Sequence, residues 1–274
     1  MKQNEIKLIA VDLDGTLLND QKKISQYSQN VFEQLAMRNK LLIIVTARNY
    51  LRTTQFLNEI HGHYAICNNG ASIWRKNGVC VYANYIESQV CDRIMREIYN
   101  HYHNIDLEII MNKKTVLVTS CQQVSCFIDE PVEGILIYTH AKDILTLLSH
   151  EHHCQKKLLE GNTLLITGQY ATKRLGLEYL LKLVNIPAKC AIAFGDDIND
   201  IEVLELCAEG IVPENGIPSA KKSATAVCGS NNADGIAKWL SKKFSIFDCN
   251  HNCTSVWLLF VWPESSKANV KVEV

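Results

Sequence analysis

The sequence predicts an α/β fold, in which a doubly wound parallel sheet is interrupted by an inserted α+β segment. Three observations lead to this prediction. Apolar strand-like runs alternate with helical spacing over residues 6–67, the same alternation returns over residues 173–243, and hairpin signals fill the stretch between them. Alternating strands and helices are typical of a parallel sheet, because parallel neighbours need a long crossover connection.

The first alternation begins at the N-terminus. Ile6 to Val11 and Leu41 to Val45 are continuous aliphatic runs of strand length, which is typical of strands buried on both faces. Apolar residues at helical spacing lie between and after them. The elements expected in order are strand 6–11, helix 28–38, strand 41–45, helix 48–60 and strand 65–67.

Hairpins replace the crossovers in the middle of the chain. Asn77-Gly78 is a strong two-residue hairpin signal between two short apolar runs. Similar turn residues recur at 112–114 and 160–162. We expect strand pairs at 72–74 with 79–82, 107–111 with 115–119 and 156–159 with 163–167, a strand at 134–139, and helices at 88–101 and 142–150.

The last part returns to the first pattern. We expect helices at 173–183, 198–207, 219–224 and 233–243, and strands at 190–194, 210–212 and 226–228. The chain therefore divides into a core domain of residues 1–82 and 169–243, an inserted α+β domain of residues 83–168, and an atypical tail of residues 244–274.

The tail contains the intensely apolar run Thr254 to Trp262. Nine residues are far fewer than the roughly 20 that cross a bilayer as a helix. This run predicts an edge strand, an interface or an aggregation-prone extension, and a role in assembly stays open beside any activity.

Composition limits the function. The net charge of -1 gives no basic footprint for nucleic acid and no polybasic block for a membrane surface. No signal-peptide run follows the N-terminus, so we expect a cytoplasmic protein. Eleven cysteines without a Cys-x-x-Cys pair predict reduced thiols. Two denser groups, His150 to Cys154 and Cys249 to Cys253, are interpreted as solvated segments rather than metal sites.

Polar residues follow the predicted strands at the edge where α/β sheets bind ligands. Asp12 is suited to attack phosphorus as a nucleophile, and Asp14 to act as general acid and then base. Gly15 allows a sharp turn beside an anion. A solvated turn is the alternative. An EF-hand is excluded, because its loop needs Gly at the sixth position, where Leu17 stands.

Two further candidates come from single residues. Thr46 ends the second strand, and its hydroxyl is suited to hold phosphoryl oxygens, although capping of the next helix is the commoner role. Lys173 opens a helix, and its ammonium group is suited to offset charge on a transferring phosphate, although a single lysine is usually a surface residue.

The third group is the acidic run after strand 190–194. Asp196 is expected to bind Mg²⁺ directly, since this ion takes few carboxylates together with waters and phosphate oxygens. Asp200 is expected to orient Lys173 or a metal-bound water, and Asn199 to donate to a phosphoryl oxygen. A helix stabilised by acidic residues in its first turn is the alternative, but three crowded carboxylates exceed what capping needs.

Taken together, these segments resemble the haloacid dehalogenase-like phosphatase superfamily, and most closely its Cof-type branch with an inserted α+β (C2-type) cap. The matching segments are residues 12–18, 46–48, 68–71, Lys173, 195–200 and 234–236. Ala47 and Arg174 stand where that branch usually has Gly, and Val203 where it often has Met.

The resemblance implies a Rossmann-like core, a mobile cap, magnesium and an aspartyl-phosphate formed on Asp12. It assigns the metal to Asp12, the backbone carbonyl of Asp14, and Asp196. Residues expected around the phosphate or in support of the site are Asp197, Asn199, Asp200, Ala47 and Asn69.

We therefore expect a Mg²⁺-dependent phosphomonoester hydrolase that acts on small phosphorylated metabolites, foremost sugar phosphates. Neither nucleic acid nor a membrane is expected as a partner, and the oligomeric state is not predicted. Two alternatives stay open. The same aspartyl-phosphate could serve a phosphotransferase or phosphomutase, or the fold could be a catalytically inactive phosphate-binding regulatory module.

Overall fold

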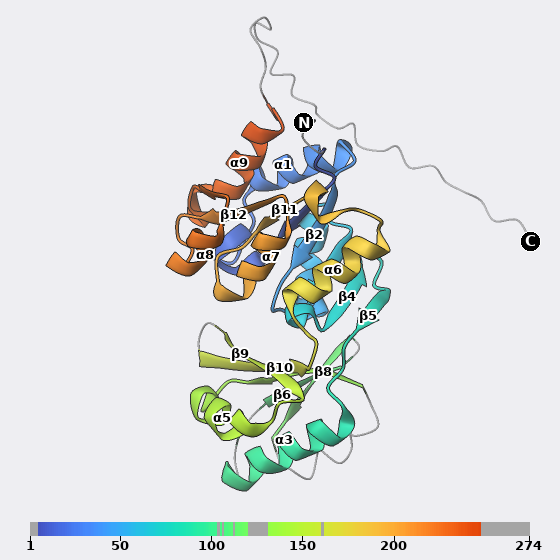
Figure 1. Cartoon of the computed structure of the whole chain (residues 1–274), viewed down its shortest axis with the longest axis vertical. Helices are drawn as coiled ribbons and strands as arrows, with labels where there is room; N and C mark the ends of the chain where they lie inside the picture. The colour runs from blue at the N-terminus through green and yellow to red at the C-terminus, as the bar shows by residue number, and fades with distance from the viewer. Residues whose placement is uncertain are drawn as a thin grey trace, which may run out of the picture.

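The computed structural model describes residues 5–102, 105, 107–111, 113–119, 131–159 and 162–247. Within these residues the chain forms an eight-stranded and a five-stranded sheet, which lie one beyond the other along the longest axis of the molecule (Figure 1). The apolar run of residues 254–262 and the Cys/His group of residues 249–253 lie outside the described residues. In the part of the chain described, no helix combines the length and the apolarity needed to cross a membrane.

The eight-stranded sheet, here called the core sheet, is parallel over six strands and antiparallel over two. Its order is β13-β12-β11-β1-β2-β3-β4-β5. The parallel strands are β1 (Leu8–Val11), β2 (Leu41–Val45), β3 (Tyr64–Cys67), β11 (Ala191–Phe194), β12 (Glu209–Pro213) and β13 (Ala226–Cys228), and the antiparallel ones are β4 (Ser72–Arg75) and β5 (Cys80–Ala83).

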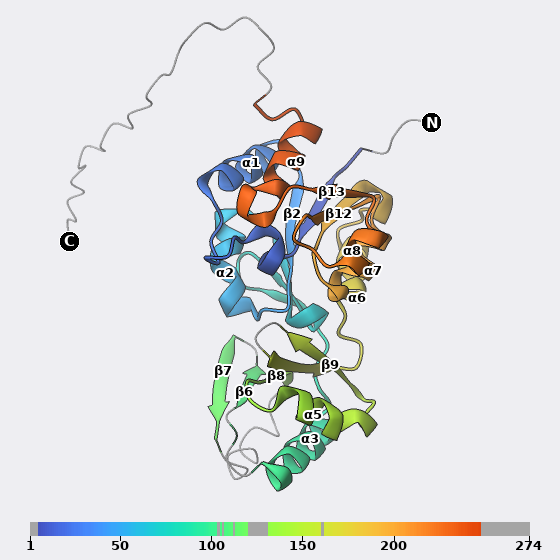
Figure 2. The ribbon, with the colours of Figure 1, turned by 90° about the vertical axis from the view of Figure 1, so that its left-hand side faces the viewer.

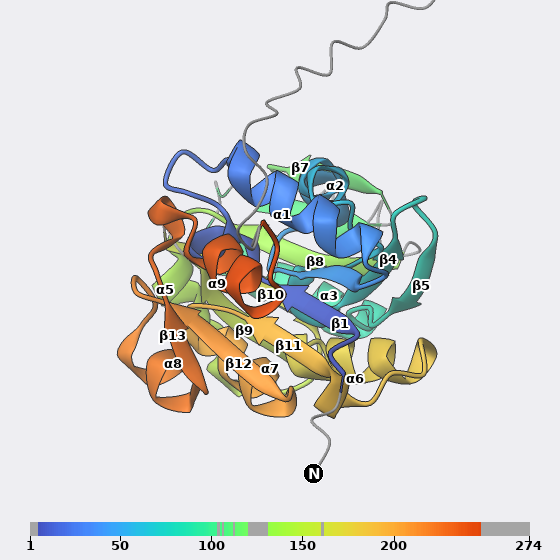
Figure 3. The ribbon, with the colours of Figure 1, turned by 90° about the horizontal axis from the view of Figure 1, so that it is seen from above.

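Helices cover both faces of the core sheet (Figure 3). One face carries α1 (Gln26–Met37), α2 (Tyr50–Glu59) and α9 (Gly235–Lys243), and the other carries α6 (Lys173–Leu183), α7 (Ile201–Leu206) and α8 (Pro218–Ser223). Side chains alternate along β1: Ile9 packs under the first set of helices and Leu8 under the second. Burial on both faces explains why these strands appear in the sequence as continuous apolar runs.

The chain path creates a switch point beside β1. After β1 the chain moves outward to β2 and β3, and it returns as β11 on the opposite side of β1. The connections that follow β1 and β11 therefore diverge, which opens a crevice at the carboxyl ends of these two strands. Ligands of open α/β sheets bind in such crevices.

The chain between β5 and α6 forms the five-stranded sheet, here called the inserted sheet. It is antiparallel, with the order β7-β6-β8-β10-β9. Its elements are α3 (Ser88–His101), β6 (Leu107–Met111), β7 (Lys114–Val118), β8 (Val132–Ile137), α5 (Ala141–Leu147), β9 (Cys154–Leu159) and β10 (Thr163–Gly168).

The two faces of the inserted sheet have different neighbours. Its helices α3 and α5 lie on the face turned away from the core sheet (Figure 2). On the opposite face Ile110, Leu136 and Leu165 form a small apolar cluster, and Ala47 of the core packs against it. The inserted sheet therefore presents an apolar face to the carboxyl edge of the core sheet.

The fold class expected from the sequence is confirmed, with local differences. Helix α2 begins at Tyr50 rather than residue 48, because the side chain of Asn49 accepts a hydrogen bond from the backbone N–H of Arg52 and caps the helix. The alternative role of Thr46 as the cap of this helix is therefore wrong. The expected helix 198–207 is divided into a 3₁₀ turn (Ile198–Asp200) and the short α7.

Candidate active site

A cleft of about 1010 Å³ lies between the two sheets. Its core side is formed by the carboxyl edge of the core sheet, and its other side by the strand ends of the inserted sheet. Of the residues singled out in the sequence, those lining it are Asp12, Asp14, Gly15, Thr46, Ala47, Lys173, Asp196, Asp197 and Asn199. The fold therefore brings together segments that are far apart in the chain.

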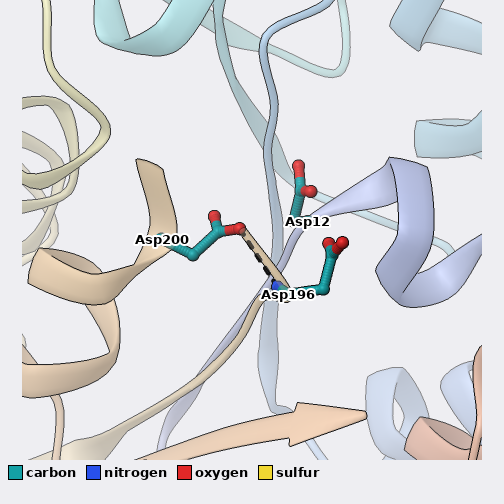
Figure 4. Close-up of side chains that lie close together, drawn as sticks. All are labelled: Asp12, Asp196 and Asp200. Carbon is teal, nitrogen blue, oxygen red and sulfur yellow. Dashed lines mark hydrogen bonds between the residues drawn. The ribbon is translucent and has the colours of Figure 1, made fainter. Parts of the chain in front are cut away.

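Three carboxylates meet at the switch point beside β1. Oxygen atoms of Asp12, Asp196 and Asp200 lie within 4.8 Å of one another, and this acidic cluster is the one such group of potential metal ligands in the described part of the chain (Figure 4). Asp12 is 6% exposed and Asp200 3% exposed. The group at His150 is not assembled in this way: His150 lies 3.3 Å from a carboxylate oxygen of Glu97.

Lys173 is the cation of this cluster. Its Nζ atom lies 2.9 Å from Oδ1 of Asp12 and 2.7 Å from Oδ1 of Asp200, and the side chain is almost completely buried. Burial alone would lower the pKa of Lys173, but the two carboxylates outweigh burial and raise it. The ammonium group therefore stays charged and holds Asp12 and Asp200 on either side of it.

The acidic cluster nevertheless carries an excess of negative charge, because Lys173 is one cation beside three carboxylates. Burial raises the pKa of Asp12 well above its usual range, and the neighbouring carboxylates add to this although Lys173 opposes it. Burial also raises the pKa of Asp196 to about 6, while a hydrogen bond from the Thr16 hydroxyl, 2.6 Å from Oδ1, acts in the opposite direction. A cation placed between these oxygens would lower both pKa values.

Asp14 is engaged differently from Asp12. Arg48 donates to both of its carboxylate oxygens, from Nε and from Nη2, at 2.7 Å each, and Lys22 lies 2.8 Å from Oδ1. Burial would raise the pKa of Asp14, but the hydrogen bonds and charges of Arg48 and Lys22 lower it. In this conformation the side chain of Asp14 is ionised and held by two cations rather than by the acidic cluster.

Asp200 uses its two oxygens for separate purposes. Oδ1 binds Lys173, and Oδ2 accepts hydrogen bonds at 3.1 Å from the backbone N–H groups of Asp196 and Asp197. Asp197 and Asp200 also form a capping box on the turn that follows. The acidic run after β11 thus supplies two carboxylates of the acidic cluster and the backbone N–H groups that hold one of them. The Oδ1 atom of Asn199 is buried and has no hydrogen-bond partner among the described residues.

The loop after β2 is supported by the loop after β3. The Oγ1 atom of Thr46 accepts a hydrogen bond of 3.2 Å from the N–H of Arg48, and its carbonyl accepts one of 3.1 Å from the N–H of Asn69. Thr46 lines the cleft, whereas Asn69 does not. The side-chain amide of Asn69 is buried without a partner among the described residues, so Asn69 supports Thr46 through its backbone.

Two glycines allow the close approaches that build the site. Gly15 has φ +75°, and a Cβ atom there would lie 2.3 Å from Oδ2 of Asp196, inside the acidic cluster. Gly70 has φ +99°, and a Cβ atom there would lie 2.0 Å from the carbonyl oxygen of Thr172, directly before Lys173. Both positions require the left-handed conformation and the absence of a side chain.

Some site residues were not identified as functional from the sequence. Thr16 and Arg48 lie within the matched segments, but only the fold shows that they bind Asp196 and Asp14. Lys22 lies in a polar turn and Asn215 in a distant loop, where Asn215 donates to the carbonyl oxygen of Gly15 at 2.6 Å. Neither has a local sequence signal, because each acts through a contact made only in the folded chain.

Known proteins share both the sequence pattern and the fold. Residues 9–240 match the model of a family described as haloacid dehalogenase-like hydrolase. A relative from Bacillus subtilis, 5-amino-6-(5-phospho-D-ribitylamino)uracil phosphatase YitU, is 27% identical over 265 residues, covering 87% of this chain and 98% of the relative.

Solved structures agree with the family match. A haloacid dehalogenase-like hydrolase from Bacteroides thetaiotaomicron superposes with a TM-score of 0.77 at 22% identity, covering 88% of this chain and 100% of that one. A subclass IIB sugar phosphatase, BT4131, gives a TM-score of 0.73 at 18% identity, covering 87% and 99%. The chain therefore belongs to the haloacid dehalogenase-like hydrolase family and is a phosphatase of that family.

Proposed function

We propose that the chain is a Mg²⁺-dependent phosphomonoester hydrolase that works through an aspartyl-phosphate on Asp12. One observation carries the proposal: a buried carboxylate at the switch point lies 2.9 Å from a buried ammonium group and within 4.8 Å of two further carboxylates. These groups are suited to serve as a nucleophile, a compensating cation and the ligands of a metal ion within one cleft.

The donor set fits Mg²⁺. This ion is bound by oxygen ligands and keeps positions for water and phosphate oxygens, and the acidic cluster supplies carboxylate oxygens beside an open cleft. Asp12, Asp196 and the backbone carbonyl of Asp14 would hold the ion, while Asp200 is already occupied by Lys173 and two backbone N–H groups. When bound, the ion would offset the repulsion between Asp12 and Asp196 and polarise a phosphoryl oxygen.

The chain's own groups supply the reaction. An oxygen of Asp12 forms a bond to phosphorus as the bond from phosphorus to the leaving alcohol breaks, and Asp14 gives the alcohol its proton. Water then attacks the aspartyl-phosphate, Asp14 takes a proton from that water, and Asp12 is regenerated with release of phosphate. Lys173 stabilises negative charge beside Asp12 in both steps.

Asp14 must change partners during this cycle. While Arg48 and Lys22 bind it, Asp14 is ionised and suited to the base step. To act as an acid it first takes a proton, which requires these two cations to release it. The oxygens of an entering phosphoryl group are acceptors for the same cations, so substrate binding itself would favour this release.

We also propose that residues 83–168 act as a cap that closes the cleft over the substrate, and that the substrates are small phosphorylated metabolites, sugar phosphates among them. The cleft has room for a small ligand and is lined by residues of both sheets. The cytoplasmic location expected from the N-terminal sequence stays a prediction.

The direct test is phosphate release from a panel of sugar phosphates, nucleotides and an aryl phosphate, with and without Mg²⁺. We expect metal-dependent release by the natural chain and none by Asp12→Asn, which keeps the shape of the residue but removes the nucleophile. Activity of Asp12→Asn equal to that of the natural chain would refute the mechanism. Transfer of phosphate to a sugar without stoichiometric inorganic phosphate would indicate a phosphotransferase instead.

A further inference from the structure

A second charged group crosses the cleft from the core to the inserted sheet. Arg52, on α2, donates from Nη2 to both carboxylate oxygens of Glu108 on β6, at 3.0 and 2.9 Å. Nη1 and Nη2 also lie 3.4 Å from the hydroxyl oxygen of Tyr138, just after β8. Because Arg52 lies on a helix of the core and its partners belong to the inserted sheet, this arrangement forms only when the inserted sheet faces the core.

Arg52 and Tyr138 both line the cleft. The other cleft residues contributed by the inserted sheet are Leu136, Leu158, Leu159 and Thr163. Aliphatic side chains cannot replace the hydrogen bonds that a polar leaving group makes with water. Among the described residues, the polar groups on this side of the cleft are the hydroxyls of Tyr138 and Thr163, and the guanidinium group of Arg52 reaches Tyr138 from the core side.

The positive charge of Arg52 is balanced by the carboxylate of Glu108. The side chain of Glu108 is 18% exposed and that of Arg52 is 49% exposed, so the carboxylate is the more shielded partner. A guanidinium group has five N–H donors, and the contact with Glu108 occupies Nη2. Donors thus remain for a neutral hydroxyl or carbonyl oxygen. A second phosphate or a carboxylate would be repelled by Glu108 and would compete with it for Arg52.

We propose that Arg52 and Tyr138 determine substrate specificity, and that Glu108 is a positioning residue that makes the cleft prefer phosphomonoesters with an uncharged, oxygen-bearing leaving group. Esters whose leaving group carries a second anionic group are disfavoured. This inference rests on the proposed phosphatase function and extends it by specifying which charge of the leaving group the cleft prefers.

The test compares two esters that differ in one charged group, glycerol 3-phosphate and 3-phosphoglycerate. The natural chain is expected to have the higher kcat/KM for glycerol 3-phosphate. Glu108→Gln keeps the size of the side chain and removes its charge, which leaves Arg52 free for an anion. We expect the kcat/KM ratio of the two esters to shift toward 3-phosphoglycerate by about tenfold, the size of one hydrogen bond to a charged group.

Two further variants test whether the shift in the kcat/KM ratio arises from the charge next to Arg52. Arg52→Gln removes the cation, so it should lower kcat/KM for glycerol 3-phosphate without the shift toward the anionic ester, and it tests the inference independently if Glu108→Gln does not fold. Asp92→Asn is the matched control, because it neutralises a carboxylate in an ion pair with Arg96 (2.7 Å) on α3, outside the cleft lining. Its ratio should equal that of the natural chain.

The outcomes separate the two proposals. Phosphate release with the same ester ratio in Glu108→Gln and the natural chain would overturn the role of Glu108 and leave the phosphatase intact. A shift of equal size in Asp92→Asn would show a general charge effect and would also overturn the inference. Failure to release phosphate from any ester of the panel would instead refute the proposed function itself.

Discussion

The Nζ atom of Lys173 lies 2.9 Å from Oδ1 of Asp12, and both side chains are buried at the switch point of the core sheet. The loop that precedes α6 brings the lysine there, and Gly70 makes the approach possible because a side chain at its position would collide with Thr172. The carboxylate and the ammonium group therefore stabilise each other within the buried site.

Lys173→Met should remove activity and reduce stability. Without the ammonium group, Asp12 and Asp200 face each other as buried and uncompensated carboxylates. Loss of one partner from a buried ion pair costs about 3–5 kcal/mol, and kcat should fall by at least about a hundredfold. Phosphate release and thermal unfolding in EDTA measure the two effects. Lys182→Met, at an exposed position of the same helix, is the control and should change neither by much.

Asp196→Asn should reduce the stabilisation of the folded protein by Mg²⁺. A Mg²⁺ ion held by the folded chain, as proposed above, should raise the melting temperature of the natural protein, and the variant should lose most of this increase. Without metal the variant should melt higher than the natural chain, because one of the crowded carboxylates is gone. Differential scanning calorimetry over a range of Mg²⁺ concentrations measures both. An equal increase with Mg²⁺ in both proteins would place the metal elsewhere. Asp143→Asn, at an exposed carboxylate, is the control.

The stability of the metal-free protein should fall as pH rises through about 6. Burial raises the pKa of Asp196 from 3.8 to about 6, so the folded chain holds this proton after the unfolded chain has lost it. The stabilisation is fully present below pH 3.8 and is lost as pH rises through 6. It amounts to about 1–3 kcal/mol.

Unfolding of the natural chain and of Asp196→Asn in EDTA, measured between pH 4 and pH 8, isolates this contribution as a difference. The gap in stability between them should widen in favour of the variant as pH increases. A gap independent of pH would show that Asp196 does not titrate in this range.

Glu133→Gln should stabilise the protein at neutral pH. Glu133, on β8, is 2% exposed, and its described partners are Ser72 and the amide of Asn68, which donates to Oε2 at 3.1 Å. Burial raises its pKa although both hydrogen bonds lower it. The stabilisation held by its proton is present below the usual pKa of a glutamate and is lost as pH rises.

Glutamine keeps the shape without the charge, so the gain should be about 1 kcal/mol at pH 7.5 and close to zero at pH 4. Denaturant unfolding at the two pH values measures it, with the exposed Glu205→Gln as control. A loss of stability at pH 7.5 would mean that the charge of Glu133 is favourable where it lies.

Most of the secondary structure could be predicted from the sequence because it depends on local patterns. Strand β2 and helix α6 have the predicted bounds, since a continuous aliphatic run and an apolar stripe at helical spacing are local signals. Helix α2 starts later than predicted, because the side chain of Asn49 caps it and the residues before Asn49 therefore lie outside the helix. The hairpin of β4 and β5 extends the core sheet as antiparallel strands, because its turn is too short for a crossover.

The sequence by itself determined the fold class, the family and the segments that carry the site. Each of these segments is recognised from neighbouring residues in the chain: an acidic pair after one strand, a hydroxyl after the next, and an acidic run after a third. The tertiary structure decided which of these groups touch. The hold of Arg48 and Lys22 on Asp14 and the contact of Arg52 with Glu108 join residues from different elements. Such contacts depend on how sheets and helices pack, and no spacing along the chain records that.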